Sequence, residues 1–134
     1  MKEIETREDI NLLVIEFYAL VRKDELLGPV FNTIIPEDHW PAHLEKLTDF
    51  WEGALLGASK FRGNPIRAHQ NADAKMGHSI EQEHFRRWLQ LWFSTIDSLY
   101  TGKLAQRAKD AARVMSTGQF MAIWSARNAT KKQP

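Results

Sequence analysis

Histidine is the residue type with most metal-binding capacity in this 134-residue chain, which has five histidines and no cysteine. Without thiols there can be no disulfide, iron–sulfur cluster, thiolate zinc site or covalently attached haem. His39, His78 and His84 sit among polar neighbours and are expected to lie in solvent. His43 differs, because helical spacing places it on an apolar stripe, three residues after Trp40. A core histidine bonded to a backbone carbonyl is the simpler interpretation of His43.

His69 follows a Gly-Asn-Pro turn in "GNPIRAHQ" and has no apolar stripe around it. From this pattern alone it could be a surface residue, a helix cap or a ligand held over a pocket. Tyr18 lies at the edge of an apolar stripe and Trp88 within one, so core packing is the first expectation for each. Five tryptophans and seven phenylalanines are many for so short a chain, and such rings also line sites for flat apolar ligands.

The spacing of histidines and glutamates partly matches two kinds of metal centre. Glu81 and His84 form one Glu-x-x-His motif, but a di-iron bundle needs two such motifs and two further glutamates. His39 and His43 are four residues apart, as in a zinc enzyme, but no glutamate follows His39 to act as a base. A Gly-rich phosphate loop and a nucleophile elbow are also missing from the sequence. The residues alone indicate an aromatic-rich helical domain that could bind a ligand.

Apolar residues recur at helical spacing along most of the chain, which predicts an all-α fold and a single domain over residues 1–134. Helices are expected from Thr6 to before Gly28-Pro29, from near Pro36 to Gly57, from a Ser79–Gln82 capping box to Gly102, and from about Lys103 to Ser125. Residues 58–79 are expected to be irregular, apart from a short turn of helix that begins at Pro65 and carries Ile66 and His69. "QNADAKMGH" is expected to be a loop, and the polar tail "NATKKQP" is expected to be frayed.

Net charge and the lengths of the apolar stretches limit the classes of partner and the location that the sequence favours. The formal net charge is +1, too small to favour nucleic acid or an anionic membrane. The apolar stretches are too short to span a membrane. "MKEIETRED" lacks the apolar segment of a secretory signal, so a cytoplasmic location is expected.

Four blocks of sequence, taken in order, suggest a family. "FYALVRKDELLGPVFN", "HWPAHLEKLTDFWEGALLG", "FRGNPIRAH" and "HFRRWLQLWF" together resemble the group III truncated haemoglobins, from about residue 17 to residue 100. The lack of a Gly-Gly pair agrees with that group. The resemblance implies a shortened globin fold, a two-over-two helical sandwich around a non-covalent haem b.

The resemblance also implies roles for particular residues. His69 matches the proximal histidine that ligates the iron, with His78 as the alternative because the segment between His69 and Phe85 is several residues longer than in the family. Phe31 matches the phenylalanine that packs on the haem face. Leu47 matches the apolar wall of the pocket.

On the distal side, Tyr18 matches the tyrosine that hydrogen-bonds bound ligand. His43 matches a histidine that can swing and gate the pocket. Trp88 matches the tryptophan whose indole N–H points at the ligand. Lys60, Arg62 and Arg67 lie in the region expected to meet the haem propionates, although a solvated role is as plausible for each.

The expected function is reversible binding of dioxygen and other diatomic ligands at a five-coordinate iron. The alternative is a haem enzyme with peroxidase-like or nitric-oxide-detoxifying activity, with a reductase as a partner. The least favoured interpretation is a haem-free helical interaction module.

Overall fold

Helices make up nearly all of the computed structural model, which describes residues 1–58, 60 and 65–131. Within these residues the helices are α1 (Arg7–Lys23), α2 (Gly28–Ile34), α3 (Trp40–Leu56), α4 (Pro65–Lys75), α5 (Gln82–Leu99) and α6 (Lys103–Lys131), with a 3₁₀ turn, η1 (Glu37–His39), before α3. Two short strands, β1 (Lys2–Glu3) and β2 (Tyr100–Thr101), pair in parallel. The all-α prediction is confirmed.

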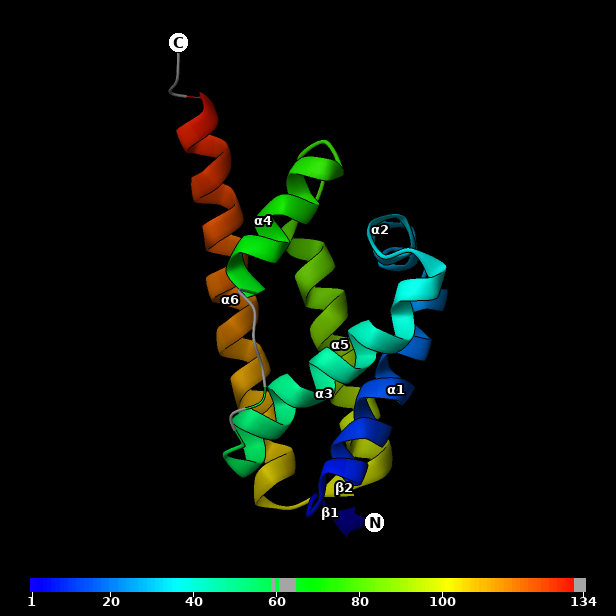
Figure 1. The fold of residues 1–134 in the computed structure, drawn as a ribbon. Helices are drawn as coiled ribbons and strands as arrows, with labels where there is room; N and C mark the ends of the chain where they lie inside the picture. Colours follow the sequence, from blue (N-terminus) through cyan, green and yellow to red (C-terminus); the bar gives the residue numbers. More distant parts are fainter. Residues whose placement is uncertain (59, 61–64, 132–134) are drawn as a thin grey trace.

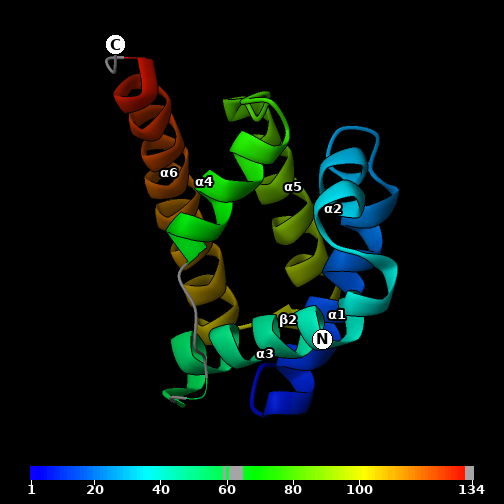
Figure 2. The ribbon, with the colours of Figure 1, turned by 45° about the horizontal axis from the view of Figure 1, so that its top comes forward.

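The long helices form two packed pairs. α1 packs on α3, α5 packs on α6, and contacts between α1 and α5 join the two pairs. Figure 1 shows α3 crossing α1, while α5 and α6 run side by side behind α4. Figure 2 shows α2 on one side of the molecule and α4 on the other, each at the upper end of these pairs. This arrangement is the expected two-over-two sandwich.

Aromatic rings fill the core where the two pairs meet. Phe17 of α1, Trp51 of α3 and Trp92 of α5 are each at most 2% exposed. The Trp92 indole N–H donates to the Ala108 carbonyl of α6 at 3.1 Å, so this buried polar atom has its partner. Such large rings remove much apolar surface from water, which is the main force holding α1, α3 and α5 together.

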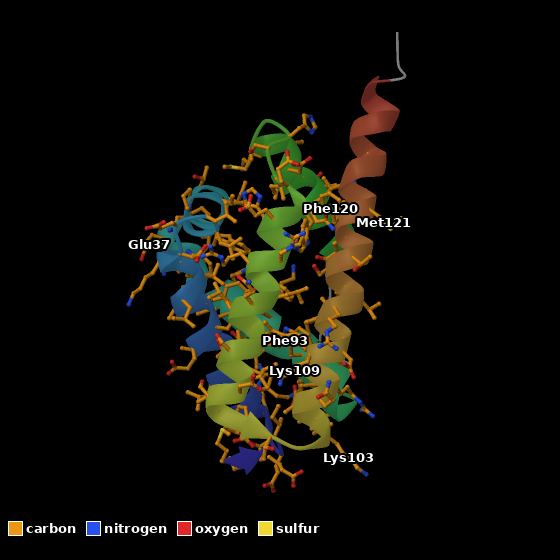
Figure 3. All side chains as sticks on the ribbon, turned by 180° about the vertical axis from the view of Figure 1, so that it is seen from behind. Glu37, Phe93, Lys103, Lys109, Phe120 and Met121 are labelled. Atoms are coloured by element: carbon orange, nitrogen blue, oxygen red, sulfur yellow. The ribbon has the colours of Figure 1, made fainter. Side chains whose placement is uncertain are left out.

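The outer face of the α5–α6 pair combines an aromatic ring with basic side chains. Figure 3 shows Phe93 of α5 beside Lys109 of α6. The Lys109 ammonium lies 5.6 Å and the Arg113 guanidinium 4.7 Å from the Phe93 ring centre. These cation–π contacts cover a ring that would otherwise face water. Further along α6, Met121 is 63% exposed, and it points away from the helices in Figure 3.

Polar contacts hold the start of α1 to the two short strands. Thr6 and Asp9 form a complete capping box at the start of α1, as their types predicted. The Tyr100 hydroxyl of β2 donates to the Asp9 carbonyl at 2.7 Å, and Lys2 of β1 pairs with the Asp9 carboxylate at 2.9 Å. The two-residue strand pair was not expected, because two residues are too few to show an alternating pattern.

Two helices differ from the sequence prediction. Gly28 and Pro29 begin α2 instead of only ending the segment before it, since proline suits the first turn of a helix. The stretch "QNADAKMGH" is not wholly a loop, because α4 continues to Lys75. Its inward side carries Ala72 and the buried Asp73 instead of large apolar residues, so periodicity could not reveal it.

Helix ends account for the other corrections. The predicted Ser79–Gln82 capping box is wrong: Glu81 is the N-cap of α5, its partner is His84, and the Ser79 hydroxyl donates to the Met76 carbonyl at 2.7 Å. α6 runs through Gly118 and past Ser125 to Lys131, so the tail begins later than predicted.

Among the described residues, no helix is both long and apolar enough to cross a membrane.

Two glycine-to-alanine changes test the packing. A Cβ at Gly28 would lie 2.7 Å from the Arg22 carbonyl oxygen, whereas a Cβ at the helical Gly118 would meet nothing within 4 Å. We expect Gly28→Ala to lower the free energy of unfolding by about 1–3 kcal/mol through this clash. Gly118→Ala should raise it by about 0.5–1 kcal/mol, because alanine favours helix.

Urea denaturation of the two variants beside the unchanged protein measures both effects. A Gly28→Ala variant as stable as the Gly118→Ala variant would show that the close approach of α1 and α2 is not a constraint.

Candidate functional site

A mainly apolar cavity is lined by residues from all six described helices. The empty space between its side chains is about 930 Å³, including its mouth to solvent. All six site residues predicted from the sequence line it: Tyr18, Phe31, His43, Leu47, His69 and Trp88. Residues that are distant in the chain therefore meet in one place.

His69 is the histidine that α4 presents to the cavity. Its Nδ1–H donates to the Pro65 carbonyl one turn earlier, at 2.6 Å, so the lone pair of the ring belongs to Nε2. Burial lowers the pKa of His69, and the bond to Pro65 partly opposes that shift. The imidazole is therefore neutral at pH 7 with one ring nitrogen held in place and the other unprotonated, which is the state that binds a metal.

Tyr18 of α1 and Trp88 of α5 form another part of the cavity wall. Tyr18 is 6% exposed, and burial raises its pKa to about 12, although a hydrogen bond from the Trp88 side chain acts the other way. The indole N–H can only donate, so the Tyr18 hydroxyl accepts from Trp88 and keeps its own proton to donate elsewhere. Phe17 lies against both rings, with its centre 4.7 Å from that of Tyr18 and 5.4 Å from that of Trp88.

His43 and Phe31 complete the ring-lined part of the cavity wall. The centre of the Tyr18 ring is 5.8 Å from that of Phe31 and 6.1 Å from that of His43. His43 is half-buried, and its pKa is lowered first by burial, then by the positive charge of Lys46 and by the charge that His69 carries only when it is protonated. His43 is therefore neutral at pH 7 and lies on the cavity wall, although its helical spacing was equally consistent with a core residue.

The remaining polar candidates lie in different surroundings. His84, expected in solvent, is half-buried and lines the cavity, and its Nδ1 accepts the Glu81 backbone N–H at 2.9 Å. His39 is exposed, as expected. His78 is exposed too, and its Nδ1 donates to the buried Asp73 carboxylate at 3.2 Å. Of these three histidines only His84 lines the cavity, and the Glu81 backbone N–H already occupies the lone pair of its Nδ1.

The basic residues suggested for the propionates do not line the cavity where they are described. Lys60 pairs with Glu52 at 3.2 Å, and Arg67 is exposed on α4. Arg62 lies outside the described residues.

Several lining residues were not found by sequence reasoning. The apolar side of α2 contributes Val30, Ile34 and Ile35, and α6 contributes the buried Ser116 and Gln119. His84 and Trp88 are four residues apart on α5, and that spacing was a usable signal for His84. For Ser116 and Gln119 the sequence offers none, because two polar residues in a helix normally face water.

A metal ion bound by protein side chains alone would need several ligands close together. In the described part of the chain, no three histidine or carboxylate side chains gather as ligands for a metal ion. The cavity provides mostly apolar walls and the imidazole of His69, whose Nδ1 is fixed by a hydrogen bond, and this combination suits a flat apolar cofactor that brings its own metal. A helical sandwich with such a cavity defines a globin-type haem protein.

Comparison with known proteins gives the family. The chain is 31% identical over 113 residues to the group 3 truncated hemoglobin ctb of Campylobacter jejuni, covering 83% of this chain and 85% of that protein. Its fold is similar to the crystal structure of a group III truncated hemoglobin from Campylobacter jejuni, with a TM-score of 0.81 and 30% identity over 92% of this chain and 95% of the other. No family model matches. The chain belongs to the group III truncated haemoglobins, a family that implies haem and small gaseous ligands.

The raised pKa of Tyr18 gives a test of its burial. At pH 10.5 an ordinary phenol is mostly ionised, whereas Tyr18, with a pKa of about 12, should stay protonated. Because the folded pKa lies above the unfolded one, the stability from Tyr18 is complete below about pH 10 and is lost as the pH rises through about 12, by roughly 2–3 kcal/mol in all.

Phenolate absorbance of the folded apoprotein, followed by circular dichroism in parallel, measures the ionisation. We expect Tyr18→Phe to leave the signal at pH 10.5 unchanged. A clear loss of phenolate in that variant would mean that Tyr18 is accessible to water.

Proposed function

We propose that this protein binds haem b through His69 without a covalent link and that it binds dioxygen and other diatomic ligands reversibly. The observation that carries the proposal is the bond from His69 Nδ1–H to the Pro65 carbonyl, which leaves Nε2 unprotonated at the cavity wall. When bound, haem would supply an iron that His69 would hold through Nε2 and that would bind a small molecule.

On the α4 side, the chain's task is to hold one imidazole still. The Pro65 carbonyl fixes both the tautomer and the ring orientation of His69, as outer partners of metal-binding histidines commonly do. The ring of Phe85 lies beside it, with centres 6.2 Å apart and planes 36° apart. These contacts restrict the imidazole before any cofactor enters, so little rotamer freedom is lost on binding.

The Tyr18 hydroxyl is the hydrogen-bond donor for the bound ligand, and Trp88 holds that hydroxyl in place. Since Trp88 donates to the Tyr18 hydroxyl, the hydroxyl proton is available for a diatomic ligand that gains partial negative charge. One such bond contributes about 1 kcal/mol or somewhat more, which approaches a tenfold slower release. A slow release suits ligand chemistry or sensing better than bulk transport.

The other lining residues shape the space. Phe31 and Leu47 provide apolar surface for the face and edge of a macrocycle. His43 is neutral because its pKa is lowered, so a movement of its ring toward or away from the ligand carries no charge into the cavity. This supports the expected gating role of His43.

Replacing the two competing histidines tests the axial bond. We expect His69→Ala to lose most haem affinity, because its cavity nitrogen is removed. His78→Ala should keep it, since His78 bonds Asp73 at the surface and does not line the cavity. Haem titration followed by the Soret band, with and without carbon monoxide, measures both variants. The reverse outcome would assign the iron to His78, and the absence of any Soret band after reconstitution of the unchanged protein would refute haem binding.

The two tyrosines offer a matched test of the distal hydrogen bond. Tyr18→Phe should release dioxygen about tenfold faster, because one donor of about 1.4 kcal/mol is lost. Tyr100→Phe should leave the rate unchanged, since the Tyr100 hydroxyl donates to the Asp9 carbonyl away from the cavity. Stopped-flow measurement of dioxygen release gives both rates. Equal rates in the two variants would remove Tyr18 from the ligand site.

The peroxidase-like or nitric-oxide-detoxifying alternative uses the same donors, so the hydrogen bonds at the cavity do not favour it over reversible binding. It stays a prediction, as do the reductase partner and the cytoplasmic location. Turnover of peroxide or nitric oxide, with a reductant and above the rate of free haem, is the measurement that would establish it.

A further inference from the structure

Three tryptophan rings form a continuous stack from the cavity wall into the core. The centre of the Trp88 ring lies 6.0 Å from that of Trp92, with planes 10° apart. The Trp92 ring stacks on Trp51 at 4.6 Å and 26°. We propose that Trp88, Trp92 and Trp51 form a relay that carries single electrons between the haem cavity and the α3 side of the core, a role that rests on the proposed haem binding.

The position of the stack gives the relay two defined ends. Trp88 lines the cavity, so the first indole lies where haem is proposed to bind. Trp92 is fully buried and Trp51 is 2% exposed. Because electron tunnelling weakens steeply with distance, rings in contact pass an electron far more readily than rings separated by aliphatic side chains. The chain has no cysteine, so no thiol competes for oxidation.

Hydrogen bonding prepares the middle ring to lose an electron. The Trp92 N–H donates to the Ala108 carbonyl at 3.1 Å. A carbonyl oxygen beside the indole nitrogen stabilises positive charge on the ring, and in a water-poor interior this effect is stronger than at the surface. Trp88 donates its N–H to the Tyr18 hydroxyl oxygen, which places a second partial negative charge beside an indole.

Tyr18 is less suited than the indoles to carry the charge. A phenol must lose its proton when it is oxidised, whereas an indole can keep its N–H proton as a cation radical. Burial raises the pKa of Tyr18 to about 12, and the partner identified for its hydroxyl, Trp88, is a donor that cannot accept a proton. The electron is therefore drawn from the indoles instead.

Hydrogen peroxide is the oxidant for this step. Its O–O bond breaks as it takes up two electrons and two solvent protons to give two water molecules. The indoles supply the two electrons one at a time, and each oxidised indole keeps its proton. A one-electron donor in solution, such as ferrocyanide, then supplies two electrons in two steps, one for each oxidised indole, and restores both rings.

The experiment uses haem-loaded protein, checked by its Soret band, and stoichiometric hydrogen peroxide without a donor. Freeze-quenched electron paramagnetic resonance should show a tryptophan radical, and peptide mass spectrometry should find oxidised Trp51. In Trp92→Phe the stack is interrupted, so oxidation of Trp51 should be lost while that of Trp88 rises. In Trp51→Phe, which leaves the Trp92 hydrogen bond intact, oxidation should stop at Trp92.

Trp40→Phe is the matched control, because Trp40 is 3% exposed but its ring does not belong to the stack. Oxidation of Trp51 should be unchanged in that variant. Equal oxidation of Trp51 in Trp92→Phe and Trp40→Phe, with haem bound in both, would overturn the relay and leave haem binding intact. Failure of the unchanged protein to bind haem would overturn both proposals.

Discussion

The hydrogen bond from His69 to the Pro65 carbonyl is the contact on which the proposed function depends. A histidine can bind a metal through either nitrogen, and rotation about its side-chain bonds would present either nitrogen in many directions. One bond within the first turn of α4 removes this freedom and leaves Nε2 unprotonated. Because α4 begins at Pro65, the start of the helix and the orientation of the imidazole are set by the same few residues.

The rest of the fold holds another part of the cavity wall at a fixed place relative to that imidazole. Tyr18 is carried by α1 and Trp88 by α5, and Phe17 lies against both rings. Trp92 and Trp51 continue the packing into the core, so Trp88 cannot shift without disturbing buried rings. Interiors packed this closely resist small displacements. The same stack that makes the cavity wall rigid also supplies the contact between indoles that the electron relay requires.

Much of the fold was readable from local pattern. Helices α1, α3, α5 and α6 carry large apolar residues at helical spacing, and the capping box of Thr6 and Asp9 was visible in the sequence. α4 was underestimated because its inward side has Ala72 and Asp73. The carboxylate of Asp73 is stabilised there because it accepts the Ile80 N–H at 3.1 Å and bonds His78. That contact involves residues beyond the helix, so no helical period records it.

The sequence by itself determined the helical class and the residue types of the candidate site, because apolar spacing and the order of four family-like blocks are local properties of the chain. Only the tertiary structure decided which nitrogen of His69 is free, that His84 lies at the cavity, and that three tryptophans stack. Each of these depends on distances between atoms that turns and helix packing bring together. A sequence states which side chains are present, but burial and hydrogen bonding decide the protonation and contacts through which they act.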